Sequence, residues 1–149
     1  MMKIKEVMCR EVKSLSPEIS VKEAWQLLSQ MEISGLPVVD SAGKLLGMFT
    51  EKDILQHILP SYLTKVGRFV YEENPKGIKK KISELEKIKV KEIMRREVVT
   101  VDEDTALCEV ARIMLTQKVR RIPVVNKEKK VVGMVARQDV LKGLWGDFR

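Results

Sequence analysis

An internal repeat limits what this chain can fold into. Residues 3–55 align without a gap to residues 89–141, an offset of 86, with 16 identities in 53 positions. The most similar stretches are GMFTEKDIL at residues 47–55 and GMVARQDVL at residues 133–141. Self-similarity at a fixed spacing is typical of one structural unit that is present twice. A unit of about 50 residues buries too little surface to be secure alone, so we expect the two copies to pack together.

Both copies show the same order of predicted secondary structure. A short extended run, VKSL or VVTV, precedes a helical pattern of apolar residues, and two β-branched runs follow. Pro37 and Pro123 stand at the entrance of the first β-branched run, where a missing N–H is tolerated. A second helix is expected to begin near Glu51 in one copy and near Arg137 in the other. The predicted order is β-α-β-β-α in each copy, which is an α+β fold.

The pattern divides the chain into a first repeat (1–59), a basic segment (60–88) and a second repeat (89–149). Residues 56–91 hold nine Lys or Arg and four Glu, and so supply most of the net charge of +7. Such a segment can attract nucleic acid or anionic lipid. Glu and Lys on neighbouring turns also suit a solvated helix, which is the interpretation we favour. We expect one or two short helices here, packed onto the module with Tyr62, Phe69 and Tyr71.

Composition and residue spacing exclude several classes of function. The longest apolar stretches have only a handful of residues, far short of the roughly 20 that span a bilayer, so no membrane segment is expected. The N-terminal residues lack an apolar secretion signal, which favours a cytoplasmic protein with reduced thiols. Cys9, Cys108 and the single histidine, His57, give neither metal-site spacing nor a catalytic triad. We therefore expect no enzyme activity, no metal and no required cofactor.

Three motifs resemble those of the CBS domain, which is named after cystathionine β-synthase. They are VMCREVKSLSP or IMRREVVTVDE, the strand SGLPVVD or RRIPVVN, and a glycine-to-aspartate turn of the form G-h-x-[ST]-x-x-D. Each motif alone is weak, but their order in tandem is specific. The resemblance implies two CBS repeats packed through their sheets with pseudo-two-fold symmetry. It also implies a regulatory module that binds adenine nucleotides or related adenosyl compounds and that often forms a homodimer.

The resemblance further implies two clefts, each built from both repeats. One cleft would combine the following residues: Met48, Thr50 and Asp53 with Val98, Val99, Arg120 and Arg121. The other would combine these: Met134, Ala136 and Asp139 with Val12, Lys13, Ser34 and Gly35. AMP, ADP, ATP and S-adenosylmethionine share the adenosine portion that such a motif binds, so the sequence does not choose among them.

The residue types fit this chemistry. A carboxylate at a helix start can accept hydrogen bonds from both hydroxyls of a ribose, a role that suits Asp53 and Asp139. Thr50 can donate its hydroxyl to a phosphate oxygen near the helix N-terminus, whereas Ala136 cannot. An alternative is that the two aspartates only cap or charge the first helical turn, which is favourable in its own right.

Arginine distinguishes the two predicted clefts. Arg120 and Arg121 stand where the first repeat has Ser34 and Gly35, and guanidinium groups suit bidentate contact with phosphate. The cleft with Thr50 is therefore predicted to be the better phosphate site, unless the arginines are only a solvated pair at a helix end. The adenine is expected among apolar side chains that also suit an ordinary core: Val98, Val99, Ile122 and Met48.

The function predicted on this basis is that of a non-catalytic ligand sensor. An adenine nucleotide would bridge the repeats and favour one arrangement by its differential affinity, and another protein or the second subunit of a homodimer would respond. The alternative is a nucleic-acid-associated protein that uses the Lys-rich segment, with the repeats as scaffold. That alternative predicts salt-sensitive binding of DNA or RNA that survives mutation of Asp53.

Overall fold

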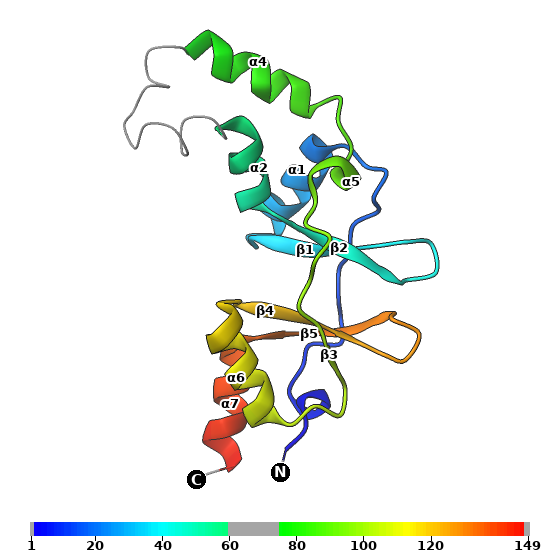
Figure 1. Ribbon diagram of the computed structural model, residues 1–149, viewed down its shortest axis with the longest axis vertical. Coiled ribbons are helices and arrows are strands. Elements are labelled where there is room, and N and C mark those ends of the chain that lie inside the picture. Colours follow the sequence, from blue (N-terminus) through cyan, green and yellow to red (C-terminus); the bar gives the residue numbers. More distant parts are fainter. Residues whose placement is uncertain (1, 60–74, 148–149) are drawn as a thin grey trace. The chain divides into compact units, whose positions relative to one another are not determined.

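The computed structural model describes residues 2–59 and 75–147 (Figure 1). It consists of two compact units whose limits differ from those of the sequence repeats. Unit 1 comprises Met1–Lys13, Val39–Leu45 and Glu97–Arg149, and unit 2 comprises Ser14–Val38 and Leu46–Arg96. Each unit thus combines most of one repeat with the leading residues of the other repeat.

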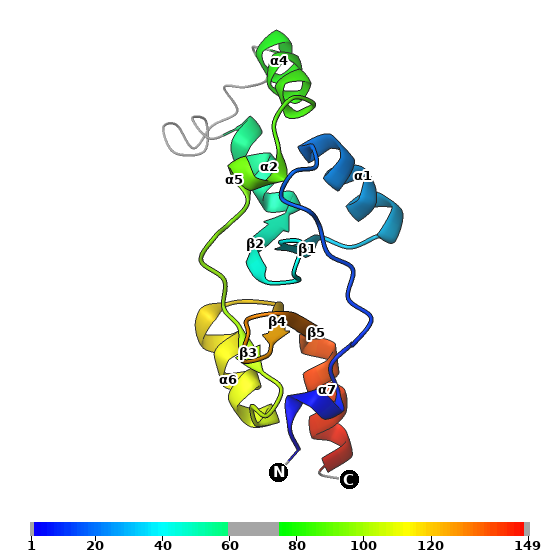
Figure 2. The ribbon, with the colours of Figure 1, turned by 90° about the vertical axis from the view of Figure 1, so that its right-hand side faces the viewer.

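Unit 1 contains a three-stranded sheet with the order β3-β4-β5. The strands are β3 (Val101–Asp102), β4 (Arg121–Val125) and β5 (Val131–Ala136), with β3 parallel to β4 and β4 antiparallel to β5. Helices α6 (Leu107–Gln117) and α7 (Arg137–Asp147) pack side by side next to this sheet (Figures 1 and 2). This is the complete β-α-β-β-α order that the sequence predicts.

Periodic apolar residues build the core of unit 1. Leu107, Val110 and Met114 follow a helical spacing on α6 and are buried, as expected for the inner face of an amphipathic helix. The short 3-10 helix η1 (Ile4–Glu6) adds the fully buried Ile4. Burial of each such aliphatic side chain stabilises the fold by about 1.5–3 kcal/mol. The buried cluster comprises Ile4, Met8, Val101, Leu107, Val110, Met114, Ile122, Val124, Val135 and Val140.

Unit 2 contains a two-stranded sheet of β1 (Gly35–Val39) and β2 (Leu45–Thr50). The predicted extended run VKSL is reduced to one parallel bridge, in which Leu15 N donates to Pro37 O at 2.9 Å. Pro17 explains the shortening, because the next donor on this side of a parallel ladder would be residue 17 and proline has no N–H. The second repeat has Glu103 at the equivalent position, and there the strand forms.

Unit 2 has four described helices: α1 (Val21–Met31), α2 (Glu51–Ile58), α4 (Pro75–Leu85) and α5 (Val90–Ile93). Helix α4 belongs to the basic segment and packs near α2 (Figure 1). Tyr62, Phe69 and Tyr71, which were expected to pack there, lie outside the described residues. The buried cluster comprises Leu15, Val21, Ala24, Leu28, Leu36, Val38, Phe49, Ile54, Leu85, Val90 and Met94.

The leading residues of each repeat, here called leader 1 (3–10) and leader 2 (89–96), pack in the unit that holds most of the other repeat. In unit 2, Lys89 and Lys91 form ion pairs with Glu18, at 2.6 Å and 2.9 Å. Leader 1 makes the equivalent pairs in unit 1, where Lys3 and Lys5 lie 3.5 Å and 3.2 Å from the carboxylate of Asp104. The exchange of leaders is therefore symmetric in the two repeats.

Each leader also extends the sheet of its unit. Met48 and Arg95 form an antiparallel bridge at β2, and Cys9 and Met134 form the same bridge at β5. Both bridges carry reciprocal backbone hydrogen bonds of 2.8–2.9 Å. The leaders thus lie directly on the strands that lead into the predicted ligand-binding turns.

Candidate functional site

The first candidate turn (residues 47–53) joins β2 to α2 through a reciprocal capping box. The carboxylate oxygen Oδ2 of Asp53 accepts from Thr50 N at 2.9 Å and from Thr50 Oγ1 at 3.1 Å. In return, Asp53 N donates to Thr50 Oγ1 at 3.4 Å. The capping role that the sequence left open for Asp53 is therefore present in the structure.

The second candidate turn (residues 133–139) has only half of this box. Ala136 N donates to Asp139 Oδ2 at 2.8 Å, but Ala136 has no hydroxyl that could cap α7 in return. Both aspartates are half-buried, and within the described part of the chain Oδ1 of each makes no hydrogen bond. Because a carboxylate offers about four acceptor sites, each aspartate can cap its helix and still accept from a ligand.

The residues before each proline lie beside the turn of their own repeat. Glu51 N donates to Ser34 O at 2.9 Å in unit 2, and Arg137 N donates to Arg120 O at 3.1 Å in unit 1. Arg121 is the cross-strand partner of Ala136 in the antiparallel pair of β4 and β5.

The two predicted clefts combine residues of different units, so their assembly remains a prediction. Met48, Thr50 and Asp53 belong to unit 2, as do Ser34 and Gly35. The remaining members of the predicted sets belong to unit 1: Val12, Lys13, Val98, Val99, Arg120, Arg121, Met134, Ala136 and Asp139.

The apolar candidates differ in burial. Ile122 is fully buried in the core of unit 1, which fits the ordinary-core alternative for this residue. Met48 is also buried, whereas Val98 and Val99 are half-buried. Val98 and Val99 are therefore the apolar candidates with the most surface left to contact a base.

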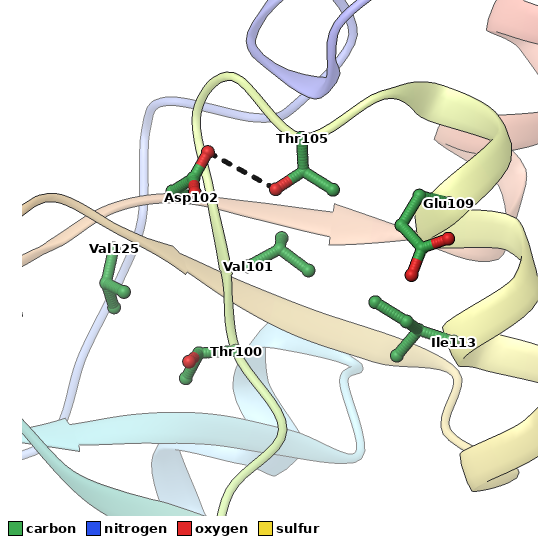
Figure 3. A pocket seen from close by; sticks show the side chains of 7 residues that line it. All are labelled: Thr100, Val101, Asp102, Thr105, Glu109, Ile113 and Val125. Atoms are coloured by element: carbon green, nitrogen blue, oxygen red, sulfur yellow. Dashed lines mark hydrogen bonds between the residues drawn. The ribbon is translucent and has the colours of Figure 1, made fainter.

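A hollow of about 430 Å³ in unit 1 was not predicted from the sequence. It lies where β3 and the turn after it approach α6 (Figure 3), and its lining residues are Thr100, Val101, Asp102, Thr105, Glu109, Ile113 and Val125. Asp102 Oδ1 accepts from Asp104 N at 2.8 Å and from Thr105 Oγ1 at 3.3 Å, which accounts for these polar groups as parts of the turn. No residue of the predicted clefts lines this hollow, and no sequence motif pointed to it.

Two further properties concern only the residues that the structure describes. No group of three or more His, Cys, Asp or Glu side chains among them could hold a metal ion. No helix within 2–59 or 75–147 combines the length and the apolar character needed to cross a membrane.

The sequence profile of the CBS domain matches residues 4–60 and 90–146. The chain belongs to the CBS domain family. Inosine-5'-monophosphate dehydrogenase of Methanocaldococcus jannaschii is 31% identical over 140 residues, which cover 94% of this chain and 23% of that enzyme. The CBS domain-containing protein DDB_G0289609 of Dictyostelium discoideum is 29% identical, with 93% and 88% of the two chains covered. This chain spans 22% to 40% of the length of the first four curated relatives that it matches.

Solved structures of CBS pairs are similar over the whole chain. CBSX2 of Arabidopsis thaliana in complex with AMP has a TM-score of 0.77 and 26% identity, with 100% of both chains covered. The CBS domain pair of protein MJ0100, in complex with 5'-methylthioadenosine and S-adenosyl-L-methionine, has a TM-score of 0.70 and 26% identity, with 99% and 98% covered. The predicted family and the α+β fold of two tandem CBS repeats are thereby confirmed.

Proposed function

We propose that this CBS pair binds an adenosyl ligand at its strand-to-helix turns and acts as a non-catalytic regulatory module. The observation that carries this proposal is the paired carboxylate at the start of the closing helix in both units. Asp53 and Asp139 each use Oδ2 for the cap and keep Oδ1 without a hydrogen bond to any described residue. The AMP complex of CBSX2 and the adenosyl complex of the MJ0100 pair support the ligand class.

The chemistry of each turn suits a ribose. The free oxygen of each aspartate accepts from a ribose hydroxyl, and this charge-assisted hydrogen bond is about twice as strong as a neutral one. The capping contact holds the carboxylate in place before the ligand arrives, which lowers the ordering cost of binding. AMP, ADP, ATP and S-adenosylmethionine all offer this ribose.

Regulation follows from the difference in ligand affinity between conformations. A ligand shifts a conformational equilibrium only by its differential affinity, which typically amounts to about 1–3 kcal/mol of coupling. A protein partner, or a second copy in a cytoplasmic homodimer, would respond to this conformational shift. The aspartates bind and cap in this proposal, and no group is assigned to acid or base catalysis.

A thermal-shift panel tests this proposal. AMP, ADP, ATP, S-adenosylmethionine and 5'-methylthioadenosine are added to wild type, Asp53→Asn and Asp139→Asn. Asparagine keeps the size and one acceptor oxygen but removes the charge, so the cap is largely retained. A ligand at 100 times its Kd is expected to stabilise wild type by about 2.7 kcal/mol, and at least one variant is expected to lose this gain.

Ser20→Ala is the matched control, because Ser20 Oγ accepts from Glu23 N at 3.1 Å and so caps α1 without a predicted ligand role. Its own stability falls by about 1 kcal/mol, and its ligand-induced shift is expected to equal that of wild type. The proposal fails if no adenosyl compound stabilises wild type, or if both aspartate variants keep the full shift.

Helix α4 is the observation that favours the second candidate function, in nucleic-acid binding. Its consecutive residues Lys79, Lys80 and Lys81 are exposed and make no ion pair with any described residue. If this helix binds RNA or DNA, the affinity falls steeply with salt and is lost when the three lysines are changed to glutamine. Binding that survives these changes, or that requires Asp53, argues against this candidate.

A further inference from the structure

The two turns differ at one pair of facing positions. A Cβ atom built on Gly35 would lie 2.7 Å from Thr50 Cγ2 and 3.0 Å from Phe49 O. Gly35 does not have a positive φ, so the close contact, and not the backbone conformation, requires glycine here. The equivalent pair in unit 1 is Arg121 and Ala136, which are cross-strand partners. Alanine lacks the methyl group Cγ2, and its absence leaves room for a side chain at residue 121.

The capping box explains why Thr50 cannot turn its methyl group away. Thr50 Oγ1 is engaged twice with Asp53, as donor to Oδ2 at 3.1 Å and as acceptor from the backbone N–H at 3.4 Å. Rotation of the threonine side chain would break both contacts. A capping threonine at one position and a side chain at the other therefore exclude each other, and each repeat has one of the two.

The replacement of Gly35 by Arg121 in the second repeat is part of a larger difference in charge. Arg137 N donates to Arg120 O at 3.1 Å, so Arg120, Arg121 and Arg137 lie together where β4 begins and β5 passes into α7. Arg120, Arg121 and Arg137 are all exposed, and none forms an ion pair within residues 2–59 and 75–147. The equivalent residues at the first turn are Ser34, Gly35 and Glu51.

We propose that the second turn binds the phosphate group of an adenine nucleotide, whereas the first turn takes an adenosyl compound without phosphate. This assignment rests on the proposed function. Guanidinium groups without an acidic partner suit bidentate contact with phosphate oxygens. At the first turn, the carboxylate of Glu51 stands where the second turn has Arg137 and repels a phosphate, and the single hydroxyl proton of Thr50 is already donated to Asp53.

This assignment differs from the sequence-based expectation, which joined Arg120 and Arg121 to Thr50. The difference arises because the hairpin register places Arg121 opposite Ala136, in the same unit. The turn with Thr50 and the turn with Ala136 are then not two phosphate sites of different strength. The turn with Ala136 prefers a ligand with phosphate, and the turn with Thr50 prefers a ligand without it.

Calorimetric titration of the full chain with AMP and with 5'-methylthioadenosine tests the assignment, because the two probes share adenosine and differ at the 5' position. Arg121→Gln is expected to weaken AMP binding by at least about tenfold, the loss of one charge-assisted contact. The affinity for 5'-methylthioadenosine is expected to change far less. Lys127→Gln, in the turn at the opposite end of the β4–β5 hairpin, removes the same charge and is expected to leave both affinities unchanged.

The outcomes separate the two proposals. If neither compound binds wild type, the proposed function fails and this assignment fails with it. If both bind but Arg121→Gln leaves the affinity for AMP intact, only the assignment fails. It also fails if Asp53→Asn abolishes AMP binding while Asp139→Asn does not.

Discussion

The two strand-to-helix turns have the same backbone arrangement and the same aspartate, yet they are completed differently. Thr50 caps α2 in unit 2, whereas in unit 1 Ala136 leaves α7 with half of the box and Arg121 occupies the facing position. A duplicated scaffold can therefore change its ligand-facing chemistry by exchanging a pair of contacting residues. A side chain at residue 35 would crowd the methyl group of Thr50, so arginine at this position requires the loss of that methyl group.

The glycine at the start of each turn lies where a leader pairs with the strand. A Cβ on Gly47 would lie 2.5 Å from the backbone oxygen of Arg95. On Gly133 the nearest atom would be Met8 Sδ at 2.6 Å, at the end of a flexible side chain, with Cys9 O at 3.1 Å. The glycine of the family motif thus has a structural reason that is independent of any ligand.

The largest expected effect is the loss of stability when the glycine at the start of a turn is replaced. Gly47→Ala should destabilise the protein by about 3 kcal/mol, because backbone must move, and Gly133→Ala by about 1 kcal/mol, because Met8 can turn aside. Urea unfolding measures both. Gly146→Ala is the control, since a Cβ there has no atom within 4 Å and alanine is the better helix former. Equal losses at residues 47 and 133 would contradict the geometry.

The next largest expected effect concerns the contact between residues 35 and 50. Gly35→Ala should cost about 2 kcal/mol, because the new methyl group meets Thr50 Cγ2. Thr50→Ser deletes only that methyl group and retains the capping oxygen. The double variant should therefore recover about 1 kcal/mol relative to additivity, as measured in a double-mutant cycle by urea unfolding. Strict additivity would mean that the two positions do not exclude each other.

The leaders can be compared by their response to acid. Hydrogen bonds from Lys89 and then Lys91 lower the pKa of Glu18 from 4.5 to about 2, and Lys5 and Lys3 lower the pKa of Asp104. Because the folded pKa is depressed, the ionised carboxylate stabilises the fold above pH 4.5, and this contribution is lost as the pH falls toward 2.

Thermal unfolding between pH 5 and pH 2 measures this contribution. Glu18→Gln should flatten the decline in Tm more than Asp104→Asn does, since the contacts of Glu18 are shorter. Added salt should reduce the difference, because the paired side chains are about half exposed. The same acid profile for wild type and Glu18→Gln would show that this exchanged leader adds no stability through its ion pairs.

The smallest effect lies in the hairpin turns. Lys129 has a φ of 64°, and the equivalent residue of the first repeat is Gly43 with a φ of 89°. Lys129→Gly should stabilise the protein by about 0.5 kcal/mol, since the left-handed conformation is costly for lysine and free for glycine. Gly43→Lys should have the opposite effect in the same unfolding assay. A loss of stability in Lys129→Gly would contradict this interpretation.

Local patterns in the sequence were sufficient to predict the repeat, the order of elements and the family. They were not sufficient for the exchange of leaders. Lys3, Lys5 and Met8 recur as Lys89, Lys91 and Met94, so each leader carries the groups that either repeat requires. Which leader docks on which repeat depends on how the chain connects them in space, and a pattern of residue types does not encode this connection.

The candidate site could be predicted only in part from the sequence. The position of Asp53 and Asp139 in the first turn of a helix is confirmed, together with the capping role, and ribose binding stays a prediction. The partnership of Arg121 with Ala136 could not be predicted, because a register shift between Val124 and Val125 changes the pairing along the hairpin. The contact between Gly35 and Thr50 could not be predicted either, because it depends on how the capping box orients one methyl group.

In the proposed function, a carboxylate at the start of a closing helix holds a ribose. A crystal structure of the full chain with AMP tests it most directly. We expect the ribose hydroxyls within hydrogen-bond distance of the Asp139 carboxylate, and phosphate oxygens in contact with Arg120 or Arg121. AMP bound away from both Asp139 and Asp53, or absent at saturating concentration, would contradict it.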